Sequence, residues 1–160
     1  MTTETTALLR EAQLRVTRPR VAVLDQLRLH PHADVETIAF HVRAELGKVS
    51  TQAIYDVLSA LCQAGLVRHL EPAGSPARYE LQRGDNHHHL VCRACGDIVD
   101  IACAVGEAPC LDAGHGHGYE VDEAEVIYWG RCPSCVAADN APTRGSRPRP
   151  TPDPATEPTR

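Results

Sequence analysis

The first part of the chain carries apolar residues three or four positions apart, the spacing of helices with one buried face. One helix opens near Thr17, where threonine can cap the chain and Pro19 suits the first turn. Asp34 can cap a second helix, and Ser50 can cap a third that ends at Gly65. The three apolar stripes are Val21, Leu24 and Leu27; Val35, Ile38, Ala39 and Val42; and Ile54, Val57, Leu58 and Leu61.

Two short extended runs follow the helices. LVRHLEP and ARYELQ are joined by Ala73-Gly74-Ser75, which indicates a hairpin. Helices followed by a hairpin are typical of a winged helix-turn-helix domain, with the helix that starts near Ser50 placed in the major groove. A helical domain with an ordinary solvated face has the same stripes, so the pattern alone leaves both interpretations open.

The remaining chain has a different pattern. HHLVC, DIVDIA and EVIYW are strand-like, and residues 137–160 hold six of the twelve prolines and are predicted to be disordered. We therefore expect an α+β protein with an N-terminal helical domain over 1–83, of winged helix-turn-helix type under the first interpretation, a small α/β domain over 84–136 and a disordered tail over 137–160.

Composition narrows the class of protein. The chain has 160 residues, 42% of them hydrophobic but only 4% aromatic, so its core is mainly aliphatic. A small core of this kind often needs a metal or a dimer interface. No run reaches the roughly 18 apolar residues of a membrane span, and the first residues do not resemble a signal peptide. We expect a cytoplasmic protein with no membrane partner.

Charge divides along the chain in a way that the net value of −5 conceals. Residues 1–70 hold eight basic and seven acidic side chains, whereas residues 71–136 hold four and eleven. DNA contact would therefore be confined to the first part, and the acidic second part suits the binding of cations.

Four of the seven cysteines form two pairs, Cys92-x-x-Cys95 and Cys132-x-x-Cys135. Two such pairs can complete a tetrahedral thiolate site of the kind that Zn²⁺ prefers. The 36 residues between the pairs must then hold a strand–helix–strand excursion. A redox pair or unrelated buried thiols are the alternatives.

A run of three histidines lies just before the first pair. Side chains alternate along a strand, so His87 and His89 project together while His88 projects to the other face. Carboxylates at Glu80 and Asp100 lie close in sequence, and imidazoles combined with carboxylates suit divalent transition metals. We predict a second, exchangeable metal site; purely structural histidines are the alternative.

These pieces together resemble the ferric uptake regulator (Fur) family of metal-dependent bacterial repressors. The resemblance covers about Leu8 to Cys135 and rests on LRVTRPR, HPHAD, STQAIYDVLSALCQAGLV, ARYEL, NHHHLVCRACGDIVDI and EVIYWGRCPSC. CAVGEAPCL resembles the actinobacterial members that repress catalase-peroxidase. The resemblance implies that residues 84–136 form the dimerisation and metal-binding domain, and that the partners are a second copy and a palindromic operator.

The resemblance also implies site residues. The structural zinc ligands are Cys92, Cys95, Cys132 and Cys135. The regulatory ligands, for Fe²⁺ or Mn²⁺, are His30, Glu80, His87, His89 and Asp100. A third site would use His88 and Glu107, although Ala124 stands where a further ligand is expected. Cys103 and Cys110 are candidate redox thiols, with two buried small residues as the alternative.

Candidate DNA contacts come from the helix near Ser50 and from the basic segment before the helices. They are Arg15, Arg18, Arg20, Ser50, Thr51, Gln52 and Tyr55. Asp56 stands where many family members have arginine, which affects base readout more than docking. Cys62 is expected to pack in the core. Five other histidines are expected to be surface polar residues: His32, His41, His69, His115 and His117.

The predicted function is that of a homodimeric repressor whose regulatory ion controls operator binding. Asp100 favours the peroxide-sensing branch, in which bound Fe²⁺ leads to oxidation of a ligand histidine, here His30 or His87. Glu80 favours the iron-responsive branch, and control of zinc uptake is a further alternative. An enzyme is not expected, because a zinc deaminase needs a His-x-Glu that is missing upstream of CPSC. A zinc-stabilised interaction module would need neither His30 nor Glu80.

Overall fold

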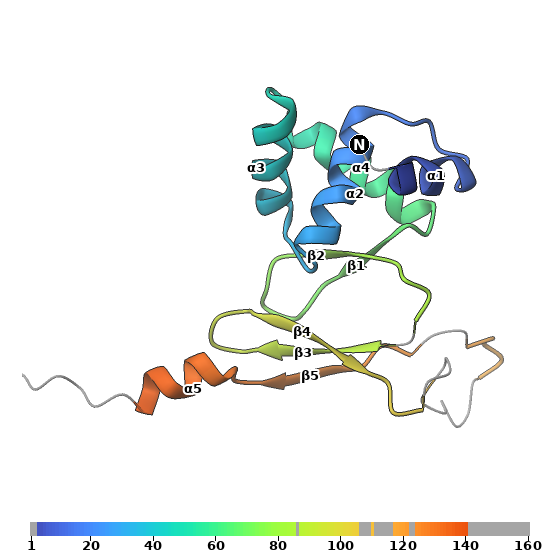
Figure 1. The fold of residues 1–160 in the computed structure, drawn as a ribbon. Coiled ribbons are helices and arrows are strands. Elements are labelled where there is room, and N and C mark those ends of the chain that lie inside the picture. The colour runs from blue at the N-terminus through green and yellow to red at the C-terminus, as the bar shows by residue number, and fades with distance from the viewer. Residues whose placement is uncertain (1–2, 86, 106–109, 111–116, 122–123, 141–160) are drawn as a thin grey trace, which may run out of the picture.

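The computed structural model describes residues 3–85, 87–105, 110, 117–121 and 124–140. Four helices come first, then a two-stranded ribbon and a three-stranded sheet, and a last helix. The elements are α1 (Thr3–Glu11), α2 (Arg18–Leu29), α3 (Val35–Leu46), α4 (Thr51–Gln63), β1 (Val67–Leu70), β2 (Arg78–Leu81), β3 (His87–Cys92), β4 (Ile98–Ala102), β5 (Ile127–Gly130) and α5 (Pro133–Asn140). The ribbon of β1 and β2 lies between the helices and the larger sheet (Figure 1).

The helix boundaries follow the capping residues. The Asp34 carboxylate accepts the Thr37 backbone N–H at 2.8 Å, and the Ser50 hydroxyl accepts that of Ala53 at 3.1 Å. Gly65, with φ 66°, follows the end of α4 and confirms its expected role beyond the helix. Thr17 occupies the N-cap position of α2, but its side chain makes no capping hydrogen bond.

The helical core is aliphatic, as predicted. Leu24, Ile38, Ile54, Leu58 and Leu61 are each at most 1% exposed, and burial of one such side chain contributes about 1.5–3 kcal/mol. This core joins α2, α3 and α4 into one body and fixes the direction of α4. Cys62 packs against the core, which confirms the prediction for that thiol.

The first two strands form the hairpin that the sequence predicted. β1 and β2 are antiparallel, and the larger sheet has the order β4-β3-β5, with β3 antiparallel to β4 and parallel to β5. A parallel pair requires a long connection. The helix expected in that connection is not found among the described residues between β4 and β5.

The central strand β3 presents two faces with different side chains. His89 pairs with Asp100 of β4, so both side chains belong to one face, together with His87. His88 and Leu90 belong to the other face, where Leu90 pairs with Val99. One strand therefore supplies two separate groups of potential ligands.

The C-terminal boundary differs from the prediction. The disordered tail was expected from residue 137, but α5 continues to Asn140, so that boundary was placed too early. Residues 141–160 lie outside the described residues. Among the helices that the structure describes, none is both long and apolar enough to cross a membrane.

Candidate functional site

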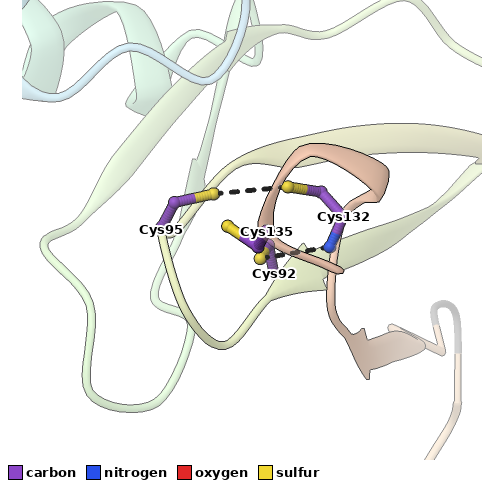
Figure 2. A group of neighbouring side chains, drawn as sticks. All are labelled: Cys92, Cys95, Cys132 and Cys135. Carbon is purple, nitrogen blue, oxygen red and sulfur yellow. Dashed lines mark hydrogen bonds between the residues drawn. The ribbon is translucent and has the colours of Figure 1, made fainter. Parts of the chain in front are cut away.

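Four cysteine thiols converge where β3 ends and α5 begins (Figure 2). Cys92 is the last residue of β3, Cys95 follows in the turn, and Cys132 and Cys135 flank the start of α5. Their sulfur atoms all lie within 4.8 Å of one another, and those of Cys95 and Cys132 are 3.7 Å apart. Tetrahedral zinc with bonds of about 2.3 Å separates its sulfurs by about 3.8 Å. The thiols thus already have the spacing of a zinc site.

The thiols differ in how readily they ionise. The Cys132 backbone N–H donates to the Cys92 sulfur at 3.3 Å and is the main cause that lowers the pKa of Cys92 to about 6. Hydrogen bonds with the thiols of Cys132 and Cys95 raise the pKa of Cys135 to about 12. Ionisation of one thiol therefore disfavours ionisation of its neighbours, and a bound divalent cation allows all four to be thiolates together.

A second cluster lies between the winged helix and the sheet. The Glu80 Oε2 atom of β2 is 2.9 Å from His32 Nε2 and 3.2 Å from His89 Nε2. Asp100 Oδ1 of β4 is 2.8 Å from His32 Nε2 and 3.7 Å from His89 Nε2. His87 Nε2 lies at the edge, 3.3 Å from Glu80 Oε1 and 4.0 Å from Asp100 Oδ1. We call these five residues the interdomain cluster.

The interdomain cluster corrects one expectation from the sequence. His30 was expected among these ligands and His32 on the surface, but His32 is 8% exposed and lies in the cluster. His30 is exposed at the C-cap of α2, and its ring stacks on that of His41 at 4.3 Å. His32 has φ 60°, and the Ala33 carbonyl accepts the Tyr79 N–H at 3.0 Å, which holds this turn against β2.

The cluster is deeply buried and strongly polar. Glu80, His32, His87 and His89 are 1–8% exposed, whereas the Asp100 side chain keeps 30% of its surface. Burial by itself would raise the pKa of Glu80, but hydrogen bonds from His32 and His89 outweigh it and hold that pKa well below its usual range. Glu80 is therefore a carboxylate in the folded protein.

A metal fits this donor set. Within the described residues, Asp100 Oδ1 is buried and has no hydrogen-bond partner, although His32 Nε2 is only 2.8 Å away. A cation would bind at this carboxylate oxygen, beside the imidazoles that converge on it. Nitrogen and oxygen donors of this kind suit Fe²⁺ or Mn²⁺.

The other face of β3 holds a third group. His88 Nε2 lies 3.3 Å from the Cys110 sulfur, and Cys103 is within 4.8 Å of both. The predicted third-site ligand Glu107 lies outside the described residues. Nothing in the sequence spacing had joined His88 to these thiols, because the residues between 103 and 110 carry no regular pattern.

The candidate DNA contacts lie at the start of α4 and around the start of α2. Tyr55 is 48% exposed, and the Gln52 amide donates to Asp56 at 2.8 Å. Thr51 accepts from Arg43 at 2.8 Å, a contact that the sequence had not indicated. The Ser50 hydroxyl is already engaged in capping α4.

The basic segment spans the start of α2: Arg15 lies before the helix, and Arg18 and Arg20 lie in its first turn. Arg15 and Arg18 are exposed, and Arg20 donates to the Arg15 backbone carbonyl at 2.8 Å. This hydrogen bond fixes the segment close to the helix.

Comparison with known proteins places the chain in a family. The family model described as the ferric uptake regulator family matches residues 11–128. The chain belongs to the ferric uptake regulator family. It is 63% identical over 133 residues to the transcriptional regulator FurA of Mycobacterium tuberculosis, covering 83% of this chain and 90% of that protein.

Solved structures agree with this assignment. The ferric uptake regulator of Vibrio cholerae matches with a TM-score of 0.64 at 25% identity, covering 81% of this chain and 99% of that one. The ferric uptake regulator of Pseudomonas aeruginosa, solved with manganese, matches with a TM-score of 0.60 at 26% identity, covering 81% and 98%. The predicted α+β fold is confirmed.

Family membership settles the broad function. Members of the ferric uptake regulator family are metal-dependent transcriptional regulators that bind operator DNA as dimers. The expectation that the chain is not an enzyme is confirmed by this membership. The four thiols have the composition and spacing of the structural zinc site.

Proposed function

We propose that the chain is a cytoplasmic repressor whose operator binding is switched by Fe²⁺ or Mn²⁺ held in the interdomain cluster. The observation that carries this proposal is the origin of the donors. His32 and Glu80 belong to the winged-helix part over 1–83, whereas His89 and Asp100 belong to β3 and β4. One ion bound by all four would join two parts of the chain.

The choice of ion follows from the donors. Three imidazoles and two carboxylates form a mixed set of nitrogen and oxygen, in contrast to the four thiolates at the end of β3. Such a set favours Fe²⁺ or Mn²⁺ over ions that prefer sulfur. Manganese in the Pseudomonas aeruginosa relative supports the same class of ion.

The switch depends on how the cluster behaves with and without its ion. With no cation, the described groups that offset the charge of the Asp100 carboxylate are the imidazoles of the cluster and the exposed Arg83 guanidinium, 3.6 Å away. A cation favours the arrangement in which the turn at His32 and the strand of His89 stay together. An ion that binds this arrangement more tightly than an open one shifts the population toward it and orients α4.

The second copy of the chain is proposed to dock on the face of the sheet opposite the interdomain cluster. Val99, Leu90 and Tyr128 are paired across β4, β3 and β5 and are 52%, 39% and 48% exposed. A row of exposed apolar side chains on a sheet marks an association surface. In this arrangement residues 84–136 form the dimerisation domain, and the two α4 helices face one palindromic operator.

The contacts with the operator are proposed for the exposed groups. Arg15, Arg18 and Arg20 would meet phosphates, while Gln52 and Tyr55 would reach base edges. Ser50 caps α4, and Thr51 accepts a hydrogen bond from Arg43. Both residues would position the helix and meet the phosphates beside it.

The proposed signal is hydrogen peroxide. When bound, Fe²⁺ would reduce peroxide beside the ligand imidazoles, whereas Mn²⁺ would not. His32, His87 and His89 all lie beside the Glu80 carboxylate, and His32 and His87 are proposed as the rings that an oxidant formed there modifies. Oxidation of either ring removes a nitrogen donor and releases the ion, which frees the operator of catalase and other oxidative-stress genes.

Iron availability is the second candidate signal. It is favoured by names among the relatives, since two proteins of Mycolicibacterium fortuitum that are 56% and 58% identical to this chain are called ferric uptake regulation proteins. In that case loss of Fe²⁺ alone releases the operator, and peroxide has no special effect.

The test is anaerobic operator-binding anisotropy with zinc-loaded protein, first with Mn²⁺ or Fe²⁺ and then with a brief pulse of peroxide. Release of the Fe²⁺ form only, with added oxygen mapped to His32 or His87, supports peroxide sensing. A Fe²⁺ form that survives the pulse supports the iron-responsive alternative. His87→Ala should lose metal-activated binding while keeping zinc and the dimer; unchanged affinity would remove His87 from the site.

A further inference from the structure

We propose that His88, Cys103 and Cys110 form an additional metal site that takes Zn²⁺. It lies on the face of β3 opposite the interdomain cluster. Its donors differ from the histidine-and-carboxylate set expected with Glu107, because two of the three are thiols.

Strand register brings the first two donors together. His88 pairs with Ile101 across β3 and β4, and Cys103 lies two residues beyond Ile101, past the end of β4. Side chains two residues apart on an extended chain project to the same face, so Cys103 follows Ile101 toward His88. Cys110 arrives from the loop that follows.

Distances fit an ion of the size of zinc. The Cys110 sulfur is 3.3 Å from His88 Nε2, and all three donor atoms lie within 4.8 Å of one another. Zinc with bonds of about 2.0 Å to nitrogen and about 2.3 Å to sulfur separates these two atoms by about 3.5 Å. Only small shifts of the side chains would therefore complete the site.

The burial of His88 also supports a metal site on this face. His88 is 6% exposed, although its neighbour on the same face, Leu90, is 39% exposed. Its Nδ1 atom is buried without a hydrogen-bond partner in the described part of the chain, and its ring meets that of Tyr128 edge-on, with 6.4 Å between the ring centroids. At Nε2 the ring is oriented by its hydrogen bond with the Cys110 sulfur, and the Cys103 sulfur lies within 4.8 Å.

The donor set predicts how tightly the ion is held. Three protein ligands leave a fourth position for water, unlike the four thiolates at the end of β3. We therefore expect zinc here to exchange with solution while the four-cysteine zinc stays. Two thiolates also make this site prefer zinc to the Fe²⁺ or Mn²⁺ of the interdomain cluster.

The test is a Co²⁺ titration of full-length, reduced, zinc-loaded protein. Cobalt bound by thiolates gives a charge-transfer absorption that cobalt bound by histidine and carboxylate lacks, so this band reports on sulfur ligation alone. Zinc retained on the protein is measured in parallel, which excludes exchange at the four-cysteine site. Wild type should bind about one Co²⁺ per chain with this band, and Zn²⁺ should displace it.

The variants separate this site from its neighbours. Cys103→Ser and Cys110→Ser should lose the band, and His88→Gln should weaken cobalt binding at least about tenfold. Cys62→Ser, a thiol in α4, and His89→Ala, in the interdomain cluster, should keep it. Absence of the band in wild type, or its persistence in both Cys103→Ser and Cys110→Ser, would overturn the proposal.

Discussion

The four-cysteine centre and the interdomain cluster share one strand but differ in where their other donors come from. Cys92 ends β3, and its partners come from the adjoining turn and from the start of α5. His89 lies three residues earlier on the same strand, yet its partners come from the turn before α3, from β2 and from β4. One centre is confined to the C-terminal part, while the other spans the chain.

This difference assigns different roles to the two centres. Four thiolates around one ion close the coordination sphere, and removing the ion removes folding free energy. A mixed cluster between two parts of the chain can be filled or emptied without loss of either core. The first centre therefore stabilises the fold, and the second is proposed to regulate its arrangement.

The largest effect is expected at the four-cysteine centre. Cys95→Ser should lose zinc and unfold much of the sheet, because structural zinc in small domains contributes about 10–16 kcal/mol. Zinc content and the near-ultraviolet circular dichroism of the purified variant measure this. The helical core should keep its secondary structure, and a stable zinc-free dimer would show that the centre is not structural.

The next effect separates His32 from His30. His32→Asn should weaken Mn²⁺ binding about a hundredfold, or about 2.7 kcal/mol, because it removes the imidazole donor on the winged-helix side and leaves Glu80 alone there. His30→Asn is the matched control, since the ring stacks on His41 outside the cluster. Isothermal titration with Mn²⁺ compares the two. A larger loss in His30→Asn would show that the metal-bound protein rearranges this turn.

A smaller effect concerns pH in the metal-free protein. The pKa of Glu80 in the folded protein lies below the ordinary value of 4.5. Ionised Glu80 therefore stabilises the fold at pH values above 4.5, and this contribution is lost as the pH falls through 4.5 toward the folded pKa. Glu80→Gln should cost about 2 kcal/mol at neutral pH and progressively less in acid. Urea unfolding of both proteins from neutral pH to below pH 4.5 measures the difference; a constant difference contradicts the prediction.

The smallest effect is expected at the rim of the cluster. Arg83 competes with a cation for Asp100, but its side chain is 54% exposed, so the ion pair is weak. Arg83→Ala should tighten Mn²⁺ binding about two- to threefold. Arg93→Ala is the control, because this guanidinium stacks on Trp129 near the four-cysteine centre. Equal effects of the two variants would indicate a general change of surface charge.

Much of the fold followed from the sequence because its signals are local. Asp34, Ser50 and Gly65 set helix ends within a turn of themselves, and apolar spacing identified the core of α2, α3 and α4. The paired cysteines were equally direct, since each pair needs only one tight turn. These features depend on a few neighbouring residues.

The interdomain cluster was only partly predictable. Alternation along β3 separated His87 and His89 from His88, and β pairing placed Asp100 beside His89. The choice between His30 and His32 depends on a turn in which His32 adopts a left-handed backbone conformation and Ala33 bonds to Tyr79. That hydrogen bond joins residues 46 positions apart, and no local pattern encodes it.

The alternation of side chains along β3 also limits how this segment can change in length. Inserting or deleting one residue between His87 and Cys92 would turn every following side chain to the opposite face, and a change next to His88 would exchange imidazoles between the two sides of the sheet. Point substitutions affect one centre at a time, whereas a frame-preserving insertion here would disturb all of them. A scan of single-codon insertions should therefore find this strand far less tolerant than the turn at Ala73-Gly74-Ser75, where one added residue turns no proposed ligand to another face.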